Sequence, residues 1–149
     1  RSFEFQSDPT KIFIIPKAKD VVPFINFAPL QNAVSLLQQN AKQFYDAMND
    51  TSLKSKPLTS EQKKKLNEAL LKMERSLITK EGLPHRPWFV HQIYAPGKYT
   101  GYGVKTLPSI REAIELRQWS EAEEQVGVVA KTLEKYSDEI GKATAIVKK

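Results

Sequence analysis

Residues 120–149 have the pattern of one long amphipathic helix. Ser120-Glu121-Ala122-Glu123 reads as a capping box, and lysines at 142, 148 and 149 follow where positive charge suits a helix end. The apolar residues recur every three or four positions and therefore share one face: Val126, Val129, Ala130, Leu133, Tyr136, Ile140, Ala143 and Val147. Such a face has to be covered, so the rest of the chain must supply partner helices.

Three more segments show the helical period. The first begins near residue 30, the second starts at Thr59 with Gln62 in a capping box and ends before Gly82, and a short third begins at Pro108. Their apolar positions are Leu30, Ala33, Val34, Leu37, Ala41, Phe44, Tyr45 and Met48, then Leu66, Ala69, Leu70, Met73 and Leu77, then Ile110, Ala113, Ile114 and Trp119. The prediction is an all-α, four-helix up-and-down bundle. Apolar residues that this small bundle cannot bury are expected to form a partner interface.

An extended lead-in is predicted over residues 1–29, ahead of a single helical domain over residues 30–149. Pro23 and Pro29 keep this part out of a helix, and the apolar run Lys11–Ile15, stopped by Pro16, is compatible with one strand. Because the chain begins at Arg1 rather than methionine, we expect it to be a fragment of a larger protein.

A long ordered loop, residues 82–107, separates the second and third helices. Prolines restrict its backbone, and aromatic residues near its start can anchor it. Its expected anchors are Pro84, Arg86, Trp88, Tyr94 and Pro96. Glycines at 97, 101 and 103 allow tight turns that hold Tyr99 and Tyr102 outward. Loops of this kind tend to carry function.

No catalytic or metal-binding constellation is evident in the chain. Cysteine is absent, which excludes disulfides, thiolate zinc sites and a cysteine nucleophile. His85 and His91 lie six apart, a spacing that fits neither a helical metal pair nor a zinc finger, and no G-x-S-x-G elbow occurs. We therefore predict no catalytic residue, metal or cofactor in this chain, and no enzyme activity of the chain alone.

The net charge of +6 raises the question of an anionic partner. The lysines are scattered, and no nucleic-acid recognition motif appears, so no nucleic-acid partner is predicted. A free-standing helical module that binds an anionic surface stays open as an alternative, and its binding would fall steeply with salt. No run reaches the ~20 apolar residues of a membrane span, so no membrane contact is predicted. Asn49-Asp50-Thr51 is a candidate glycosylation sequon.

The stretch "GLPHRPWFVHQIYAP", with Tyr102 and then Leu107-Pro108-Ser109-Ile110, resembles the C-terminal helical domain of the transferrin receptor and glutamate carboxypeptidase family. Val22-Pro23-Phe24 and "LLKMERSLI" upstream also look like that family's pattern, so the resemblance covers roughly residues 20–147. It implies a homodimerisation domain that follows a peptidase domain in the same parent. The expected partners are then a second copy of the chain and this peptidase domain. It also implies a parent with an N-terminal membrane anchor and this domain on the extracytoplasmic side.

The resemblance further implies that peptidase members hold two zinc ions through their peptidase domain, at positions outside this chain. In glutamate carboxypeptidases the loop reaches the substrate pocket, where a Lys-Tyr pair binds the glutamate carboxylate. Read without gaps, that pair falls on Gly101 and Tyr102, so the tyrosine is kept and the lysine is not. The parent is then a zinc-dependent carboxypeptidase, or alternatively a receptor-like, non-catalytic family member.

Overall fold

The computed structural model describes residues 16–148. The strand predicted at Lys11–Ile15 therefore lies outside the described residues. Residues 16–27 form neither helix nor strand, and Arg117 donates a hydrogen bond to the Asp20 carbonyl in this lead-in. The elements that follow are α1 (Ala28–Met48), α2 (Ser52–Ser55), α3 (Ser60–Met73), the 3-10 helix η1 (Glu74–Leu77), β1 (Tyr94–Pro96), β2 (Val104–Thr106), α4 (Pro108–Glu115) and α5 (Trp119–Lys148).

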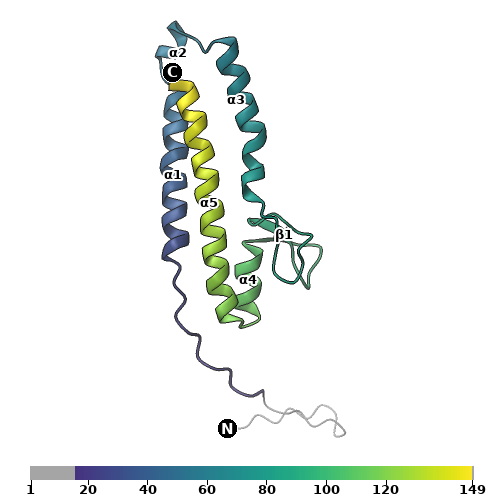
Figure 1. Ribbon diagram of the computed structural model, residues 1–149. Coiled ribbons are helices and arrows are strands. Elements are labelled where there is room, and N and C mark those ends of the chain that lie inside the picture. The colour runs from purple at the N-terminus through teal and green to yellow at the C-terminus, as the bar shows by residue number, and fades with distance from the viewer. Residues whose placement is uncertain (1–15, 149) are drawn as a thin grey trace, which may run out of the picture.

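Helix α5 is the centre of the domain. Helices α1, α3 and α4, together with η1, all pack on it, whereas α1 and α3 hardly touch each other. In Figure 1, α1 runs along one side of α5, and α3 and the shorter α4 lie on the other side. Helices α1 and α3 therefore bury their apolar faces chiefly against α5 and not against each other.

The order of directions differs from an up-and-down bundle. Ala33 packs with Val126 and Val129, while Ala47, fourteen residues later, packs with Ile140 and Val147, so α1 and α5 run parallel. Helix α3 runs the opposite way, and α4 turns back into α5 through the short connection at residues 116–118. The predicted helical class is correct, but the four-helix up-and-down arrangement is wrong in this respect.

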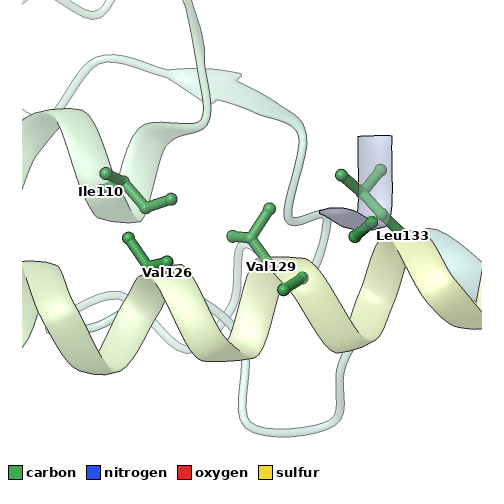
Figure 2. Packing of buried hydrophobic residues seen from close by; sticks show 6 residues of the cluster. Ile110, Val126, Val129 and Leu133 are labelled. Carbon is green, nitrogen blue, oxygen red and sulfur yellow. The ribbon is translucent and has the colours of Figure 1, made fainter. Parts of the chain in front are cut away.

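Two apolar clusters fill the space along α5. One joins Ile110 of α4 and Ala33 of α1 to four α5 residues, and Figure 2 shows Ile110 above Val126, with Val129 and Leu133 further along α5. The other joins Ala47 of α1 and Leu66 and Met73 of α3 to the C-terminal half of α5. Between the clusters, Asn40 Nδ2 donates to Ser137 Oγ over 2.8 Å, and Ser137 is fully buried. This polar contact satisfies buried groups and fixes α1 against α5.

Part of the predicted core is exposed instead. Val34, Tyr45, Met48 and Leu70 lie outside the buried clusters. Trp119 begins α5 and does not belong to the third helix. The second helix ends as η1 at Leu77, before Gly82, because Ile78 already pairs with His91.

The capping predictions had opposite outcomes. The Thr59–Gln62 capping box is confirmed: Gln62 N donates to Thr59 Oγ1, and Thr59 N donates to Gln62 Oε1. The Ser120 cap is wrong, because Ala122 N already donates to the Gln118 carbonyl and Ser120 lies inside α5. Among residues 16–148, no helix is long and apolar enough to span a bilayer.

Candidate functional site

The loop between η1 and α4 begins by pairing with the segment that precedes it. Thr79 N donates to the Val90 carbonyl and Gln92 N to the Leu77 carbonyl, each over 3.0 Å. The Gln92 side chain is fully buried and donates to Thr79 Oγ1 over 2.7 Å. The loop therefore has a hydrogen-bonded base rather than a free start.

Above this base, residues 82–89 form a tight turn that depends on Gly82. Gly82 has φ of +68°, and a Cβ there would lie 2.2 Å from the Pro87 carbonyl oxygen. Leu83, which is buried, donates its N–H to the Phe89 carbonyl over 2.8 Å. His85 also has a positive φ, of 61°, and its Nε2 lies 2.9 Å from Glu121 Oε2 on α5.

Arg86 and Glu112 form a buried ion pair that ties the loop to α4. Arg86 Nη2 donates to both Glu112 carboxylate oxygens over 2.8 Å, and both residues are more than nine-tenths buried. Arg86 Nη1 also donates to the Pro96 carbonyl, and Glu112 Oε1 accepts from Lys98 N over 2.7 Å. One ion pair thus holds the backbone of the hairpin at the end of β1. Within the described part of the chain Arg86 Nε has no partner, but the four hydrogen bonds of Arg86 and Glu112 join residue 86, residues 96 and 98 and α4 into one support.

The hairpin itself pairs β1 with β2 in antiparallel register, with Ala95 opposite Lys105. Gly97 N donates to the Gly103 carbonyl, and Gly103 N to the Thr100 carbonyl, so the tip is closed by its own backbone. Tyr99 and Tyr102 at this tip are 74% and fully exposed, respectively. Apart from its two chain neighbours, no described residue has an atom within 4 Å of where a Cβ on Gly101 would stand, so the tip is not covered at this point.

A second polar group lies at the start of β1. His91 Nδ1 accepts hydrogen bonds from the backbone N–H groups of Ile93 and Tyr94, and the His91 and Tyr94 rings lie 4.0 Å apart. Two N–H donors on Nδ1 require the neutral ring with its proton on Nε2. Burial lowers the pKa of His91, and the Glu74 carboxylate partly opposes this shift. Tyr94 donates to Glu74 over 2.7 Å, and this bond raises the pKa of the phenol.

The predicted loop residues divide into two groups. Arg86 is buried, Pro84 is partly buried, and the Pro96 carbonyl is bound by Arg86. Trp88 is 70% exposed and Tyr94 is 45% exposed, so the chain itself covers little of the tryptophan ring. Asn49 is exposed at the C-terminal end of α1, where its Nδ2 donates to the Tyr45 carbonyl.

Glu112 is the functional residue that sequence reasoning missed. A signal was present, because Glu112 is the first acidic residue that follows Arg86 in the chain, after a stretch without Asp or Glu from residue 82 to residue 111. Its place between Ile110 and Ala113 on the inward face of α4 also makes it unusual, since an unpaired glutamate is rarely buried. Over residues 16–148, no group of three His, Cys, Asp or Glu side chains is placed to hold a metal ion.

Comparisons with known proteins give a consistent result. Residues 25–141 match the family model described as the transferrin receptor-like dimerisation domain. A probable glutamate carboxypeptidase LAMP1 of Arabidopsis thaliana is 36% identical over 83 residues, which is 55% of this chain and 12% of that protein. A probable glutamate carboxypeptidase of Arthroderma benhamiae is 30% identical over 95 residues, 64% of this chain and 11% of that protein. The match thus takes in only a small part of each relative.

Proposed function

The chain belongs to the transferrin receptor-like dimerisation domain family, and from this we propose that it is the homodimerisation domain of a glutamate carboxypeptidase-like protein, with its 82–107 loop contributing to that protein's substrate pocket. The relatives named as probable glutamate carboxypeptidases support the kind of parent. The observation that carries the role of the loop is the hairpin, whose base is fixed by a buried ion pair while its tip is bare.

The fixed base and the exposed tip of the hairpin both favour a contact with another surface. A buried Arg–Glu pair is worth retaining where geometry matters, and this one holds Pro96 and Lys98 on either side of the first tip residue. Aromatic side chains at a rigid, exposed tip are suited to contact another surface with little loss of entropy. The hydroxyl of Tyr102 can donate a hydrogen bond to a carboxylate, and Lys98 adds positive charge nearby.

The chemistry of the parent is proposed to lie in another domain. Two zinc ions would be held by His, Asp and Glu residues of a peptidase domain that is also a packing partner of this chain, and no residue of this chain is assigned to them. Alternatively, the parent is a receptor-like, non-catalytic family member. Metal analysis of the purified parent separates the two: about two zinc ions per chain supports the peptidase, and none supports the receptor-like alternative.

We also propose an extracytoplasmic position for the domain, in a parent with an N-terminal membrane anchor. The exposed Asn49 of the sequon is accessible to a glycan, and its Nδ2 would keep one hydrogen for its bond to Tyr45. A mass decrease after enzymatic deglycosylation, lost in Thr51→Ala, would support this position. An unglycosylated Asn49 in protein from a secretory host would count against it.

Self-association of the parent is tested by light scattering at micromolar concentration. The proposed function requires a dimer. A full-length protein that stays monomeric at this concentration would contradict the homodimerisation role, whatever its catalytic activity.

The role of Tyr102 is tested by steady-state kinetics on peptides with a C-terminal glutamate. A hydrogen bond to a charged group contributes about 1.5–3 kcal/mol, so Tyr102→Phe should lower kcat/KM by about 10- to 150-fold. Tyr99→Phe is the matched control, because Tyr99 is exposed on the same hairpin tip. Equal kcat/KM values for unmodified protein and Tyr102→Phe would remove the tyrosine from the pocket.

A further inference from the structure

Helix α1 is almost uncharged although most of its surface is exposed. Its 21 residues include only Lys42 and Asp46 as charged side chains, and these pair with each other over 2.7 Å. The exposed positions of α3 and α5 are charged by comparison: Glu61, Lys63, Lys64, Lys65, Glu68 and Lys72 on α3, and Glu123, Glu124, Lys131, Glu134, Lys135, Asp138, Lys142 and Lys148 on α5. Depletion of charge is the compositional mark of the core of a protein–protein interface.

An apolar stripe follows the exposed side of α1. Val34, Tyr45 and Met48 are 37%, 68% and 40% exposed, and Ala41 is exposed between them. Val34, Ala41 and Met48 are spaced by seven residues, so they lie on one line along the helix. Helix α1 lies at the edge of the domain in Figure 1, and among the described elements it packs chiefly on α5. The stripe borders the packed side of the helix, because Val34 and Met48 each lie four residues from a residue that packs on the core, Leu30 and Phe44 respectively.

We propose that this stripe is the surface on which a second copy of the chain packs, with the two α1 helices antiparallel about a twofold axis near Ala41. The inference rests on the proposed homodimerisation function and names its surface. A twofold interface must be self-complementary, because the same patch is used by both copies. The stripe meets this condition, since Val34 and Met48 are each seven residues from Ala41.

The proposed packing brings apolar groups together along the whole of α1. Val34 of one copy faces Met48 of the other, Tyr45 covers the second copy's helix near Gln38, and the small Ala41 lets the helices approach closely. The helix is about 31 Å long, and a standard interface buries roughly 800 Å² per partner. The full exposed face of α1 is therefore needed, and its uncharged Gln31, Gln38 and Ser35 side chains can serve as the rim.

A cross-link at the axis tests this geometry. Helices that pack at about 8–10 Å between axes bring facing Cα atoms at a twofold axis to roughly 3.5–5.5 Å, which overlaps the range of a disulfide. These 149 residues contain no cysteine. We use Ala41→Cys in the full-length protein, with Glu134→Cys on the outer face of α5 as the control, and unmodified protein alongside reports any cross-link through cysteines elsewhere in the parent. We expect Ala41→Cys alone to add a covalent dimer after mild oxidation. Absence of that band from an otherwise dimeric protein would overturn the proposal.

Charge substitutions provide the second test, measured as the dimer dissociation constant by sedimentation equilibrium. Tyr45→Glu should raise Kd at least about 10-fold. Leu71→Glu, at an apolar position on α3 that is 80% exposed, should leave Kd unchanged. If Leu71→Glu raised Kd and Tyr45→Glu did not, the protein would still be a dimer, but its interface would not lie on α1. A monomeric unmodified protein would instead reject the homodimerisation function itself. Circular dichroism checks that each variant is folded.

Discussion

Gly82 has a backbone conformation and surroundings that exclude any side chain. Its φ of +68° disfavours L-residues, and a Cβ would collide with the backbone of Pro87. Gly82→Ala should therefore lower the free energy of unfolding by about 2–4 kcal/mol in urea titrations. Gly101→Ala is the control, because its Cβ would meet nothing within 4 Å, and we expect a change within about 0.5 kcal/mol. Equal effects of the two substitutions would show that the turn at Gly82 tolerates a side chain.

The Arg86–Glu112 pair is expected to show strong coupling. Arg86→Met or Glu112→Gln leaves one buried charge without its counter-charge, which costs about 3–5 kcal/mol. The double variant removes both charges, so its loss of stability should be smaller than the sum of the two single losses by at least about 1 kcal/mol. Additive losses in urea unfolding would contradict an energetically coupled pair. Lys105 and Glu115 form a partly exposed pair on the same hairpin and α4, and they should show little coupling.

We expect His91 to make the stability of the domain depend on pH. Its folded-state pKa is below the ordinary value because of burial, so the unfolded state binds the proton more readily. The stability of the neutral, folded form is fully present above the unfolded pKa of about 6.5 and is lost as pH falls from there through the folded pKa. His91→Asn keeps an acceptor for the Ile93 and Tyr94 N–H groups and removes the titrating ring. Thermal unfolding from pH 7.5 to 5 should show a smaller decline for this variant, and identical declines would exclude His91.

At the scale of single residues, the importance of some loop positions could be predicted from the sequence. Gly82 stands out as a stop signal and Arg86 as part of a motif, but the collision of Gly82 with Pro87 and the pairing of Arg86 with Glu112 are tertiary contacts. The exposure of Trp88 is a further example, because an aromatic residue in a loop of this kind reads as an anchor whether its ring faces inward or outward. Spacing along a chain does not determine which way a loop side chain points.

At the scale of elements, the capping hydrogen bonds at the start of α3 agree with the prediction from the sequence. Thr59 and Gln62 complete a reciprocal capping box. Thr59→Ala should cost about 1 kcal/mol of unfolding free energy, measured by urea titration. Ser60→Ala, one residue further on and also exposed, is the control and should change little. Helix propensity favours alanine at position 60, so a loss from Ser60→Ala as large as that from Thr59→Ala would show that the effect is not specific to the cap.

The Ser120 cap was wrong for a reason that also belongs to this scale. A short α4 ends at Glu115, and the turn through Arg117, with φ of 60°, begins α5 one residue ahead of the serine. A capping motif gives the residue types for a helix start, but the turn before the helix decides where the first hydrogen bond forms. Similarly, the apolar positions of α1 form a wide face in the sequence. Because α1 packs chiefly on α5, only a narrow part of this face is buried.

At the scale of the whole molecule, the number and order of the main helices follow from periodicity, whereas their directions do not. An apolar face needs a partner, but the pattern is the same for parallel and antiparallel neighbours. The parallel packing of α1 and α5 depends on contacts such as Asn40 with Ser137 and Ala33 with Val129, which join residues far apart in sequence. The resemblance of the loop sequence to a known family identified the domain more securely than helix patterning alone.

The central position of α5 has a consequence for biosynthesis. Helix α5, on which α1, α3 and α4 all pack, is the last element of this chain to be synthesised. Asn40, for example, has its hydrogen-bond partner, Ser137, 97 residues later in the chain. Since α1 and α3 hardly touch each other, the nascent domain has no core of its own until α5 leaves the ribosome. Its apolar stripes stay uncovered during that interval, which is the condition under which nascent chains aggregate or engage chaperones. Completion of this domain is therefore governed by the arrival of its final helix, and any lesion that stops translation before α5 leaves the earlier helices without a fold.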